Sequence, residues 1–235
     1  ILELKNVSAG YDHEVILHQV NLKIYEHDFL GIIGPNGGGK TTLLSTLARE
    51  LPGPVILCTT THIFPFSEYP LISGDNAGAL NAALARSRVV CLGQPGKDGK
   101  LTTPALPFSL LLELAPWVLV EADGSKRLPL KAHASYEPVI PPESSHTILV
   151  AGASGFGTPI SQAVHRPERF CTLTGAQLQD LVTPELAARA ISREGLARQV
   201  FLNQVESRSD WAQAEQFARA LQGTGIQMFA GSLRQ

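Results

Sequence analysis

Cysteine is scarce in this sequence, and long apolar runs are missing. The cysteines Cys58, Cys91 and Cys171 lie far apart and lack C-x-x-C spacing, so a zinc site is not indicated. Their odd number argues against a disulfide framework, and we expect a reducing, cytoplasmic compartment. No apolar run reaches the roughly 18 residues of a spanning helix, and charged residues recur within positions 1–30. We therefore expect no membrane span and no secretory leader.

Charge of one sign is not in excess either. The chain carries 19 lysines and arginines against 21 aspartates and glutamates, spread along its length. Nucleic acid is therefore not expected as a partner, and small-molecule chemistry is favoured. A chain of 235 residues, 44% of them hydrophobic, can bury one α/β core, so we expect a single domain over residues 1–235. Because the first residue is Ile1, we expect a trimmed N-terminus. The oligomeric state is not indicated.

The apolar pattern changes near residue 29. In V-N-L-K-I-Y-E, residues 20–26, apolar and polar residues alternate, which is typical of a half-buried antiparallel strand. After residue 29, short and wholly apolar strands are separated by helical stretches, which predicts a parallel sheet covered on both faces. Strands are predicted near residues 29–33, 55–60, 88–92, 117–122, 147–151 and 199–203. Residues 1–28 are thus expected to form an antiparallel segment before a parallel core over residues 29–235.

Helices and loops complete this outline. Leucines at helical spacing follow residue 42, and Pro52-Gly53 is expected to end that helix. The last helix carries one apolar stripe from Trp211 to Leu221, typical of a helix packed on a sheet. Residues 93–107 and 124–145 are rich in Gly, Pro and charge, so both are predicted to be long surface loops, of the kind that often act as lids near a site.

Residues 34–42, G-P-N-G-G-G-K-T-T, fit the phosphate-loop pattern G-x-x-x-x-G-K-T between an apolar strand and an amphipathic helix. The glycines allow backbone N–H groups to face phosphates, and the helix N-terminus adds partial positive charge. Lys40 would reach the β and γ oxygens, and Thr41 would hold Mg²⁺. A merely glycine-rich turn needs neither side chain. The predicted nucleotide contacts are Gly34, Pro35, Asn36, Gly37, Gly38, Gly39, Lys40, Thr41 and Thr42. The fold class is therefore a P-loop NTPase-like three-layer sandwich with antiparallel N-terminal strands.

Two carboxylates follow the strand near residue 117. Period two puts Glu121 and Asp123 on one face at its carboxyl end, the edge at which parallel sheets bind ligands. There they would hold Mg²⁺ with Thr41 or polarise an attacking water. The alternative is a solvated strand end. Lys126 and Arg127 follow, either near phosphate charge or as an exposed basic pair.

Other strand ends offer further candidates. Thr61 and His62 would face the phosphates, although threonine is also simply a good strand former. Asn203 begins N-Q-V-E-S, which looks like an altered N-K-x-D base-reading motif, so it would bond a purine edge without implying guanine. Arg166 and Arg169 are either phosphate clamps or surface charge.

Two resemblances meet in this chain. Residues 1–44 resemble the N-terminal segment of ABC transporter ATPases of the zinc and manganese importer type, in L-E-L-K-N-V-S-A-G-Y and in the phosphate loop. This resemblance implies that Tyr11 stacks on adenine. Beyond Leu44 the L-S-G-G-Q helix start and the strand ending in Asp-Glu of that family are missing.

Residues 46–235 instead resemble the selenium-dependent hydroxylase accessory protein family (YqeC-like), in T-T-T-H-I-F-P-F, V-L-V-E-A-D-G-S-K-R-L-P-L-K-A-H and V-H-R-P-E-R-F. The chain thus looks like a hybrid joined near residue 44. This second resemblance implies a role in maturing a selenium-dependent molybdenum hydroxylase, with that enzyme or its maturation proteins as partner.

Together these patterns predict a nucleoside triphosphatase with Lys40, Glu121 and Asp123 as catalytic residues. ATP is the expected nucleotide, with GTP as the alternative, and Mg²⁺ is the expected metal. Three other classes stay open. They are an ABC transport subunit, which the missing L-S-G-G-Q disfavours, a small-molecule kinase that holds its acceptor with His62 or the 93–107 loop, and a non-catalytic nucleotide-binding scaffold.

Overall fold

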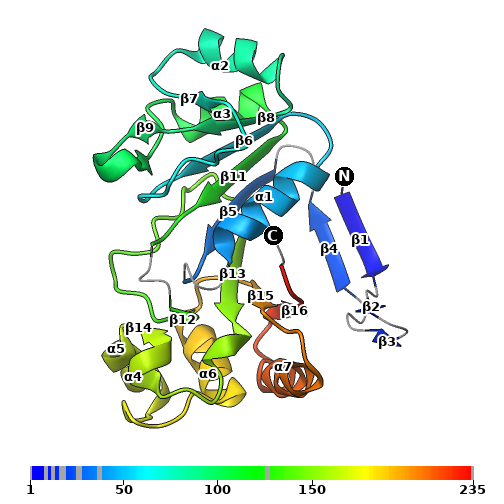
Figure 1. Ribbon diagram of the computed structural model, residues 1–235, viewed down its shortest axis with the longest axis vertical. Helices are drawn as coiled ribbons and strands as arrows, with labels where there is room; N and C mark the ends of the chain where they lie inside the picture. The colour runs from blue at the N-terminus through cyan, green and yellow to red at the C-terminus, as the bar shows by residue number, and fades with distance from the viewer. Residues whose placement is uncertain are drawn as a thin grey trace.

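The computed structural model describes residues 2–7, 10–11, 14–15, 20–24, 28–35, 39–124 and 128–233, and the side chains from residue 29 onward within these ranges. This part of the chain has an α/β fold in which helices flank a parallel sheet (Figure 1). No helix in the described ranges has the length and apolar character needed to cross a bilayer.

The central sheet has eight strands, and every ladder in it is parallel. Its spatial order is β16-β15-β13-β5-β11-β6-β8-β7. The strands are β5 (Asp28–Ile33), β6 (Val55–Thr59), β7 (Leu71–Ile72), β8 (Val89–Leu92), β11 (Trp117–Glu121), β13 (His146–Gly152), β15 (Gln199–Asn203) and β16 (Gln227–Ala230). The six predicted strands are confirmed, whereas the edge strands β7 and β16 were not predicted.

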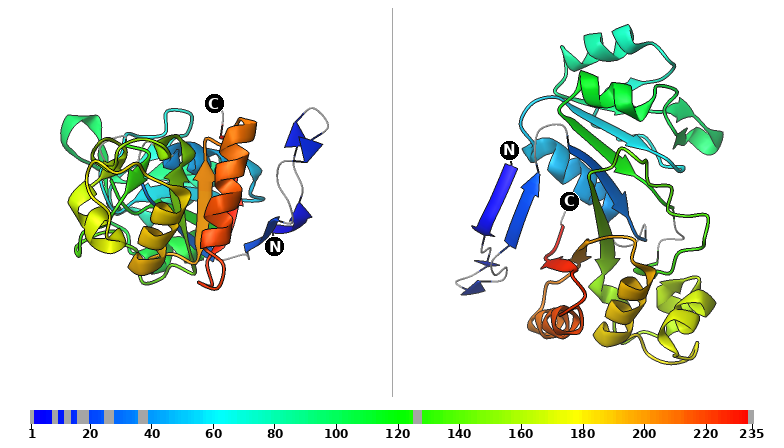
Figure 2. Two further views of the ribbon diagram at one scale, coloured as in Figure 1. Left: turned by 90° about the horizontal axis from the view of Figure 1, so that it is seen from below. Right: turned by 180° about the vertical axis from the view of Figure 1, so that it is seen from behind.

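Helices cover both faces of the sheet, so the predicted three-layer sandwich is confirmed (Figures 1 and 2). Along β5 the faces alternate: Leu30 and Ile32 pack with the leucines of α1, whereas Phe29 and Ile33 belong to the opposite face. The helices are α1 (Lys40–Glu50), α2 (Ala77–Leu84), α3 (Phe108–Leu114), α4 (Ile160–Ala163), α5 (Pro167–Thr174), α6 (Pro184–Glu194) and α7 (Arg208–Ala220). On the second face, α2 and α3 cover the β6–β8 side, and α4 to α7 cover the β13–β16 side.

Helix ends follow the local sequence. Helix α1 ends at Glu50, directly before the Leu51-Pro52-Gly53 stop. Helix α7 begins with a capping box in which Ser207 and Asp210 each accept from the other's backbone N–H. Its stripe is buried at Ala214, Phe217 and Leu221, which confirms the predicted packing.

The N-terminal segment forms antiparallel pairs, as predicted. Strand β1 (Leu2–Val7) pairs with β4 (Val20–Ile24), and β2 (Gly10–Tyr11) pairs with β3 (Glu14–Val15). Among the described residues, none of these strands joins the eight-stranded sheet, and Figure 2 shows them apart from it.

The first predicted surface loop, residues 93–107, contains a hairpin. Strands β9 (Gln94–Pro95) and β10 (Leu101–Thr102) pair antiparallel around the 3₁₀ turn η2 (Lys97–Gly99). Leu101 is buried, and its backbone exchanges hydrogen bonds of 2.7 and 3.2 Å with Ile63. The predicted surface loop is therefore a hairpin that is partly internal, because one apolar side chain anchors it beside the chain that follows β6.

The second predicted surface loop, residues 124–145, is partly internal. Strand β12 (Leu130–Lys131) pairs parallel with β14 (Val164–His165), which lies between α4 and α5. All residues from Leu130 to His133 are buried, two of them charged or ionisable. The surface-loop prediction was wrong for this stretch, because its polar side chains have partners from distant parts of the sequence.

Candidate functional site

The phosphate loop lies at the carboxyl end of β5, the central strand, between the ends of β11 and β13. This is the edge of a parallel sheet at which ligands bind. Gly34 and Gly39 have φ angles of 118° and 94°, and a Cβ at Gly34 would lie 2.1 Å from the Val150 carbonyl oxygen. Glycine is required there because no other residue fits. The predicted contacts Asn36, Gly37 and Gly38 lie outside the described residues.

Lys40 is the first residue of α1, and its exposed fraction is 0%. Its Nζ donates to the carbonyl oxygens of Gly34 and Asp123, the latter at 2.6 Å, and to Oδ1 of Asp123. Glu121 Oε1 lies 3.5 Å from the same nitrogen. The structure therefore brings the three predicted catalytic residues together, with the ammonium group held by the chain itself.

Asp123 is the centre of this arrangement. Both of its carboxylate oxygens lie 3.0 Å from the backbone nitrogen of Gly34, which donates to them. Its Oδ2 also lies 3.0 Å from Lys131 Nζ and 3.0 Å from His133 Nε2. Burial alone would raise the pKa of Asp123, but the His133 hydrogen bond and the charges of Lys40 and Lys131 outweigh it and hold the pKa well below its ordinary value. Asp123 therefore stays ionised and acts as an acceptor.

Glu121 and Thr41 form a second pair. The Thr41 hydroxyl donates to Glu121 Oε2 at 3.2 Å, from the start of α1 to the end of β11. Burial raises the pKa of Glu121, and the neighbouring Lys40 partly offsets this effect. Hydroxyl and carboxylate oxygens are what Mg²⁺ prefers, and it is commonly held by one or two protein oxygens plus phosphates. The pair fits that chemistry, although the described residues contain no group of three or more His, Cys, Asp or Glu side chains arranged for a metal.

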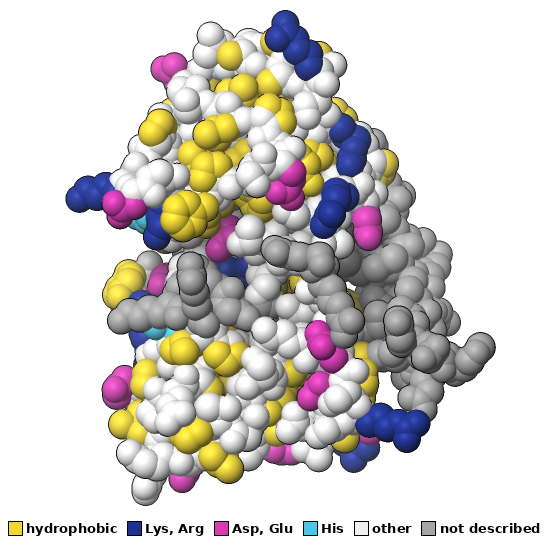
Figure 3. Space-filling view, viewed as in Figure 1, with side chains coloured by type: hydrophobic (Ala, Val, Ile, Leu, Met, Phe, Trp, Pro, Cys, Tyr) yellow, Lys and Arg dark blue, Asp and Glu magenta, His cyan; other side chains and the backbone are white. Residues whose placement is uncertain are grey.

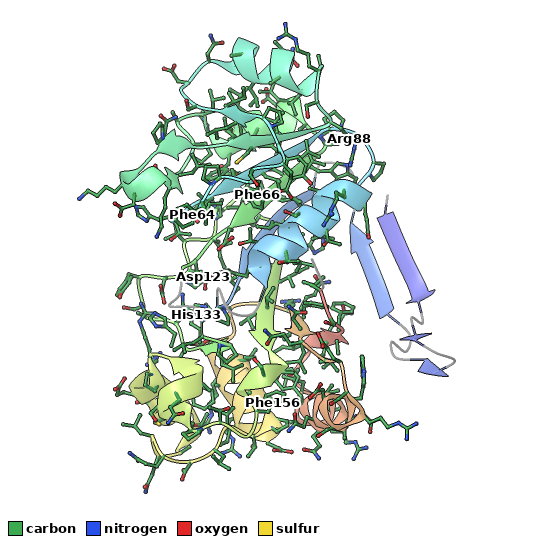
Figure 4. The ribbon with its side chains drawn as sticks, viewed as in Figure 1. Phe64, Phe66, Arg88, Asp123, His133 and Phe156 are labelled. Atoms are coloured by element: carbon green, nitrogen blue, oxygen red, sulfur yellow. The ribbon has the colours of Figure 1, made fainter. Side chains whose placement is uncertain are left out.

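His133 lies between two carboxylates. Its Nδ1 is 2.9 Å from Glu194 Oε2, its Nε2 is 3.0 Å from Asp123 Oδ2, and its backbone nitrogen donates to Glu194 Oε1 at 2.6 Å. An ionised carboxylate only accepts, so hydrogen bonds to both sides require a hydrogen on each ring nitrogen. Burial lowers the pKa of His133, but the bonds to Asp123 and Glu194 outweigh it and raise the pKa above its ordinary value. In Figure 4, Asp123 and His133 lie next to each other, below Phe64 and above α4, α5 and α6.

These contacts belong to one ionic network that sequence reasoning found only in part. Among the described residues, its ion pairs join four basic side chains to four acidic ones across six segments of the fold: Lys40, Lys131, His133 and Arg166 with Glu121, Asp123, Glu137 and Glu194. Lys131, His133, Glu137 and Glu194 were not predicted. The alternation in L-P-L-K-A-H-A was a usable signal, because it puts Lys131 and His133 on one face of an extended segment.

The remaining predicted residues lie around this centre. Asn203 is buried, its Nδ2 lies 2.3 Å from the position of a Cβ on Gly39, and its Oδ1 accepts from Leu233 N at 2.8 Å. Thr61 is half-buried and its hydroxyl faces Gly124, whereas His62 is exposed. Side chains of Tyr11, Lys126 and Arg127 lie outside the described part of the chain.

The two predicted arginines have different surroundings. Arg166, in the left-handed conformation before α5, pairs with Glu137 and lies over the Tyr136 ring, while Arg169 is exposed. Among the described residues, neither arginine forms an ion pair with Glu121 or Asp123, the acidic residues beside Lys40. In Figure 3, the part that carries α2 and α3 forms the upper end of the molecule, and the part that carries α4, α5 and α6 forms the lower end.

Comparison with known proteins gives two kinds of relative. A family described as YqeC protein matches residues 31–168. The protein of Escherichia coli (strain K12) called uncharacterized protein YqeC is 34% identical over 194 residues, which cover 74% of this chain and 75% of that protein.

Shorter matches join the chain to transport ATPases. The zinc import ATP-binding protein ZnuC of Histophilus somni is 46% identical over 52 residues, and that of Pasteurella multocida is 42% identical over 52 residues. Each of these matches covers 22% of this chain and 20% of the relative, so the likeness is limited to a segment. No solved structure matches the chain.

Proposed function

The chain belongs to the YqeC family, and we propose that it binds a nucleoside triphosphate with Mg²⁺ at the phosphate loop and hydrolyses it. The proposal includes ATP as the preferred nucleotide, with GTP as the alternative. It also treats residues 29–235 as one P-loop domain with residues 1–28 appended. The partial similarity to ATP-binding proteins supports nucleotide binding, and the geometry below supports hydrolysis.

One observation carries the proposal. Lys40 and Thr41 begin α1 directly after the glycine-rich sequence G-P-N-G-G-G, and Glu121 and Asp123 reach them from the end of the adjacent strand β11. An ammonium group, a hydroxyl and two carboxylates are thus together at a helix N-terminus, where backbone N–H groups and the helix dipole favour phosphate. A purely structural turn needs none of these four side chains.

The residues would divide the work of phosphoryl transfer to water. Lys40 would exchange its contact with Asp123 for the β and γ phosphate oxygens and neutralise charge that develops there. Thr41 and Glu121 would hold Mg²⁺, which supplies further charge neutralisation when bound. Both oxygens of Asp123 already accept hydrogen bonds from Gly34, Lys131 and His133, so we assign Asp123 to holding Lys40 rather than to the metal. Glu121 would also orient the attacking water, since it lies beside Thr41 and Lys40 at the end of β11.

The test compares Lys40→Ala with Lys97→Ala. Lys97 is an exposed lysine in the β9–β10 turn, so its loss controls for the change of charge. We expect phosphate release from ATP to require Mg²⁺ and to fall by about 10²-fold to 10³-fold in Lys40→Ala, with wild-type rates in Lys97→Ala. GTP in parallel assays gives the base preference. Equal turnover in wild type and Lys40→Ala would remove the hydrolase proposal.

We further propose that the protein serves as an accessory factor for a selenium-dependent molybdenum hydroxylase, or acts with the maturation proteins of that enzyme. This role rests on the resemblance of residues 46–235 to that accessory family. Co-expression of the hydroxylase with wild type or Lys40→Ala tests it. Equal hydroxylase activity in both cultures, at equal amounts of hydroxylase protein, would contradict it.

A small-molecule kinase is the second candidate, and the surface beside the site favours keeping it. Phe64 is 60% exposed, Lys100 Nζ lies 5.4 Å from its ring centre, and His62 is exposed on the same segment. The Ile63 and Leu101 hydrogen bonds anchor this segment to the β9–β10 hairpin, so an acceptor would meet a fixed surface. Phosphate release in the absence of any acceptor would reject this candidate.

A further inference from the structure

In the proposed function, Lys131 and His133 enter only as hydrogen-bond donors to Asp123, and Glu194 has no part. The side chains of all three residues are too buried to meet a ligand. The side-chain exposed fractions are 0%, 2% and 4%. Burying so many ionisable groups is expensive unless every one of them is paired. In the structure each of these side chains is paired, and the pairs connect the end of α6 with the phosphate loop.

We propose that Glu194 and His133, together with Lys131, are positioning residues that fix the Asp123 carboxylate and through it set the place of the Lys40 ammonium group. The connection runs from Glu194 to His133, from His133 to Asp123 and from Asp123 to Lys40. It joins α6 to the site and deepens the proposed function, on which its catalytic part rests.

The two oxygens of Asp123 have different roles in this arrangement. Oδ2 accepts from Lys131 Nζ and from His133 Nε2, both at 3.0 Å, whereas Oδ1 faces Lys40. Lys131 is itself held by Gly124 O at 2.6 Å and by Glu137 Oε1 at 3.1 Å. The Oδ2 side is therefore fixed by groups that stay in place when Lys40 moves to a phosphate, so Asp123 keeps its orientation.

Glu194 is suited to hold His133 and to little else. Its two oxygens meet two donors of one residue, the backbone N–H at 2.6 Å and the ring Nδ1 at 2.9 Å. It is also the last residue of α6, and a negative charge at a helix C-terminus is unfavourable for the helix dipole. Glu194 is therefore unfavourable for the helix dipole and nearly inaccessible to solvent, and its two hydrogen bonds to His133 offset these costs.

Glu194→Gln tests the connection with a minimal change of shape. Glutamine offers one acceptor oxygen and one NH₂ group, so it satisfies only one of the two His133 donors and removes the charge. Glu185→Gln is the matched control, because Glu185 lies in the first turn of the same helix and is exposed. His133→Gln is the second variant, in case Glu194→Gln is too unstable to purify.

Two readouts separate positioning from folding. The first is the rate at which acetic anhydride acylates Lys40 in nucleotide-free protein, measured by peptide mass spectrometry. We expect severalfold faster acylation in Glu194→Gln and His133→Gln, and wild-type rates in Glu185→Gln. The second is the kcat and KM of MgATP hydrolysis. We expect kcat to fall by about 10-fold to 100-fold, by analogy with the outer-shell partners of metal ligands, with little change in KM, because the loop amides still bind the phosphates.

The outcomes distinguish this inference from the proposed function. Unchanged Lys40 acylation in both variants overturns the inference, even if kcat falls. Faster acylation in a protein that neither binds nor hydrolyses nucleotide supports the positioning of Lys40 and rejects the proposed function. A rise in KM alone, with kcat unchanged, also overturns the inference, because it would assign the residues to ground-state binding.

Discussion

The β9–β10 hairpin and the segment around β12 both follow strands of the sheet, and both carry lysines, yet they treat charge in opposite ways. Lys97 is exposed and Lys100 lies over the ring of the exposed Phe64, so water solvates the hairpin's charges. Lys131 is fully enclosed by Asp123, Glu137 and the carbonyl oxygen of Gly124.

The difference between the two segments shows which groups stabilise a buried charge. The hairpin is anchored by one apolar side chain, Leu101, and needs no ionic partner inside the protein. The β12 segment brings Lys131 and His133 into the interior, where carboxylates from the chain directly after β11, from the chain before β13 and from α6 meet them. A buried cation is tolerated when ionic and hydrogen-bond partners surround it. Here those partners come from other parts of the chain.

Replacing the lysines tests this contrast most strongly. Lys131→Met should lower the free energy of unfolding by about 3–5 kcal/mol, because Asp123 and Glu137 would lose a buried partner. Lys97→Met, the control on the hairpin, should change it by less than about 0.5 kcal/mol. Urea unfolding at pH 7 measures both. Similar unfolding midpoints for the two variants would mean that the buried ionic network contributes no more to the free energy of unfolding than a surface charge does.

The leucines of the two segments provide a matched apolar pair. Leu101 is 2% exposed and Leu130 is 3% exposed. Each change to alanine should cost about 2–4 kcal/mol through lost burial and a cavity. Only Leu130→Ala should also speed Lys40 acylation, since Leu130 adjoins Lys131. Thermal unfolding and mass spectrometry check the pair, and faster acylation in Leu101→Ala would break the contrast.

The pH dependence of stability gives a smaller effect with a definite sign. The pKa of His133 in the folded protein is raised above its ordinary value of 6.5. Its stabilisation is therefore fully present below pH 6.5 and is lost as the pH rises through the folded-state pKa. The difference in unfolding free energy between wild type and His133→Gln should shrink from pH 6 to pH 9, measured without Mg²⁺. The exposed His62, changed to Gln, is the control, and a difference that grows with pH would contradict the sign.

The smallest expected change is in the hairpin turn. Asp98 has a φ of 55°, in the left-handed region that favours glycine. Asp98→Gly should change stability by only a few tenths of a kcal/mol, since relief of strain is offset by the greater freedom of glycine in the unfolded chain. Differential scanning calorimetry would detect a larger loss. Such a loss would show that the aspartate has a role beyond the turn.

Much of the fold could be predicted because its signals are local. Wholly apolar strands such as V-V-C-L and V-F-L placed the parallel sheet, and the loop with Lys40 and Thr41 placed the site at the end of β5. Glu121 and Asp123 followed from period two at the end of β11. Strand β16 was missed because only its last residue, Ala230, is buried and Gln227 is exposed at its start, whereas the equally short β8 is buried throughout.

The ionic network could not be predicted, because its pairing is not local. His133 and Glu194 are 61 positions apart and meet only after α6 has folded back beside β12. Pro129 and the charged residues around it have the composition of a loop, and that composition says nothing of distant partners. The base-reading role expected of Asn203 and the stacking of Tyr11 on adenine stay predictions.

Repulsion between anions gives the site its last consequence. Glu121 and Asp123 both lie beside Lys40, the ammonium group that a nucleotide would contact. In the proposed function, a polyphosphate that draws Lys40 away from Asp123 brings its own negative charge close to these two acidic side chains. A divalent cation carried with the polyphosphate offsets that repulsion, so free nucleotide should bind far more weakly than its divalent-metal complex, and the metal would favour binding as well as turnover.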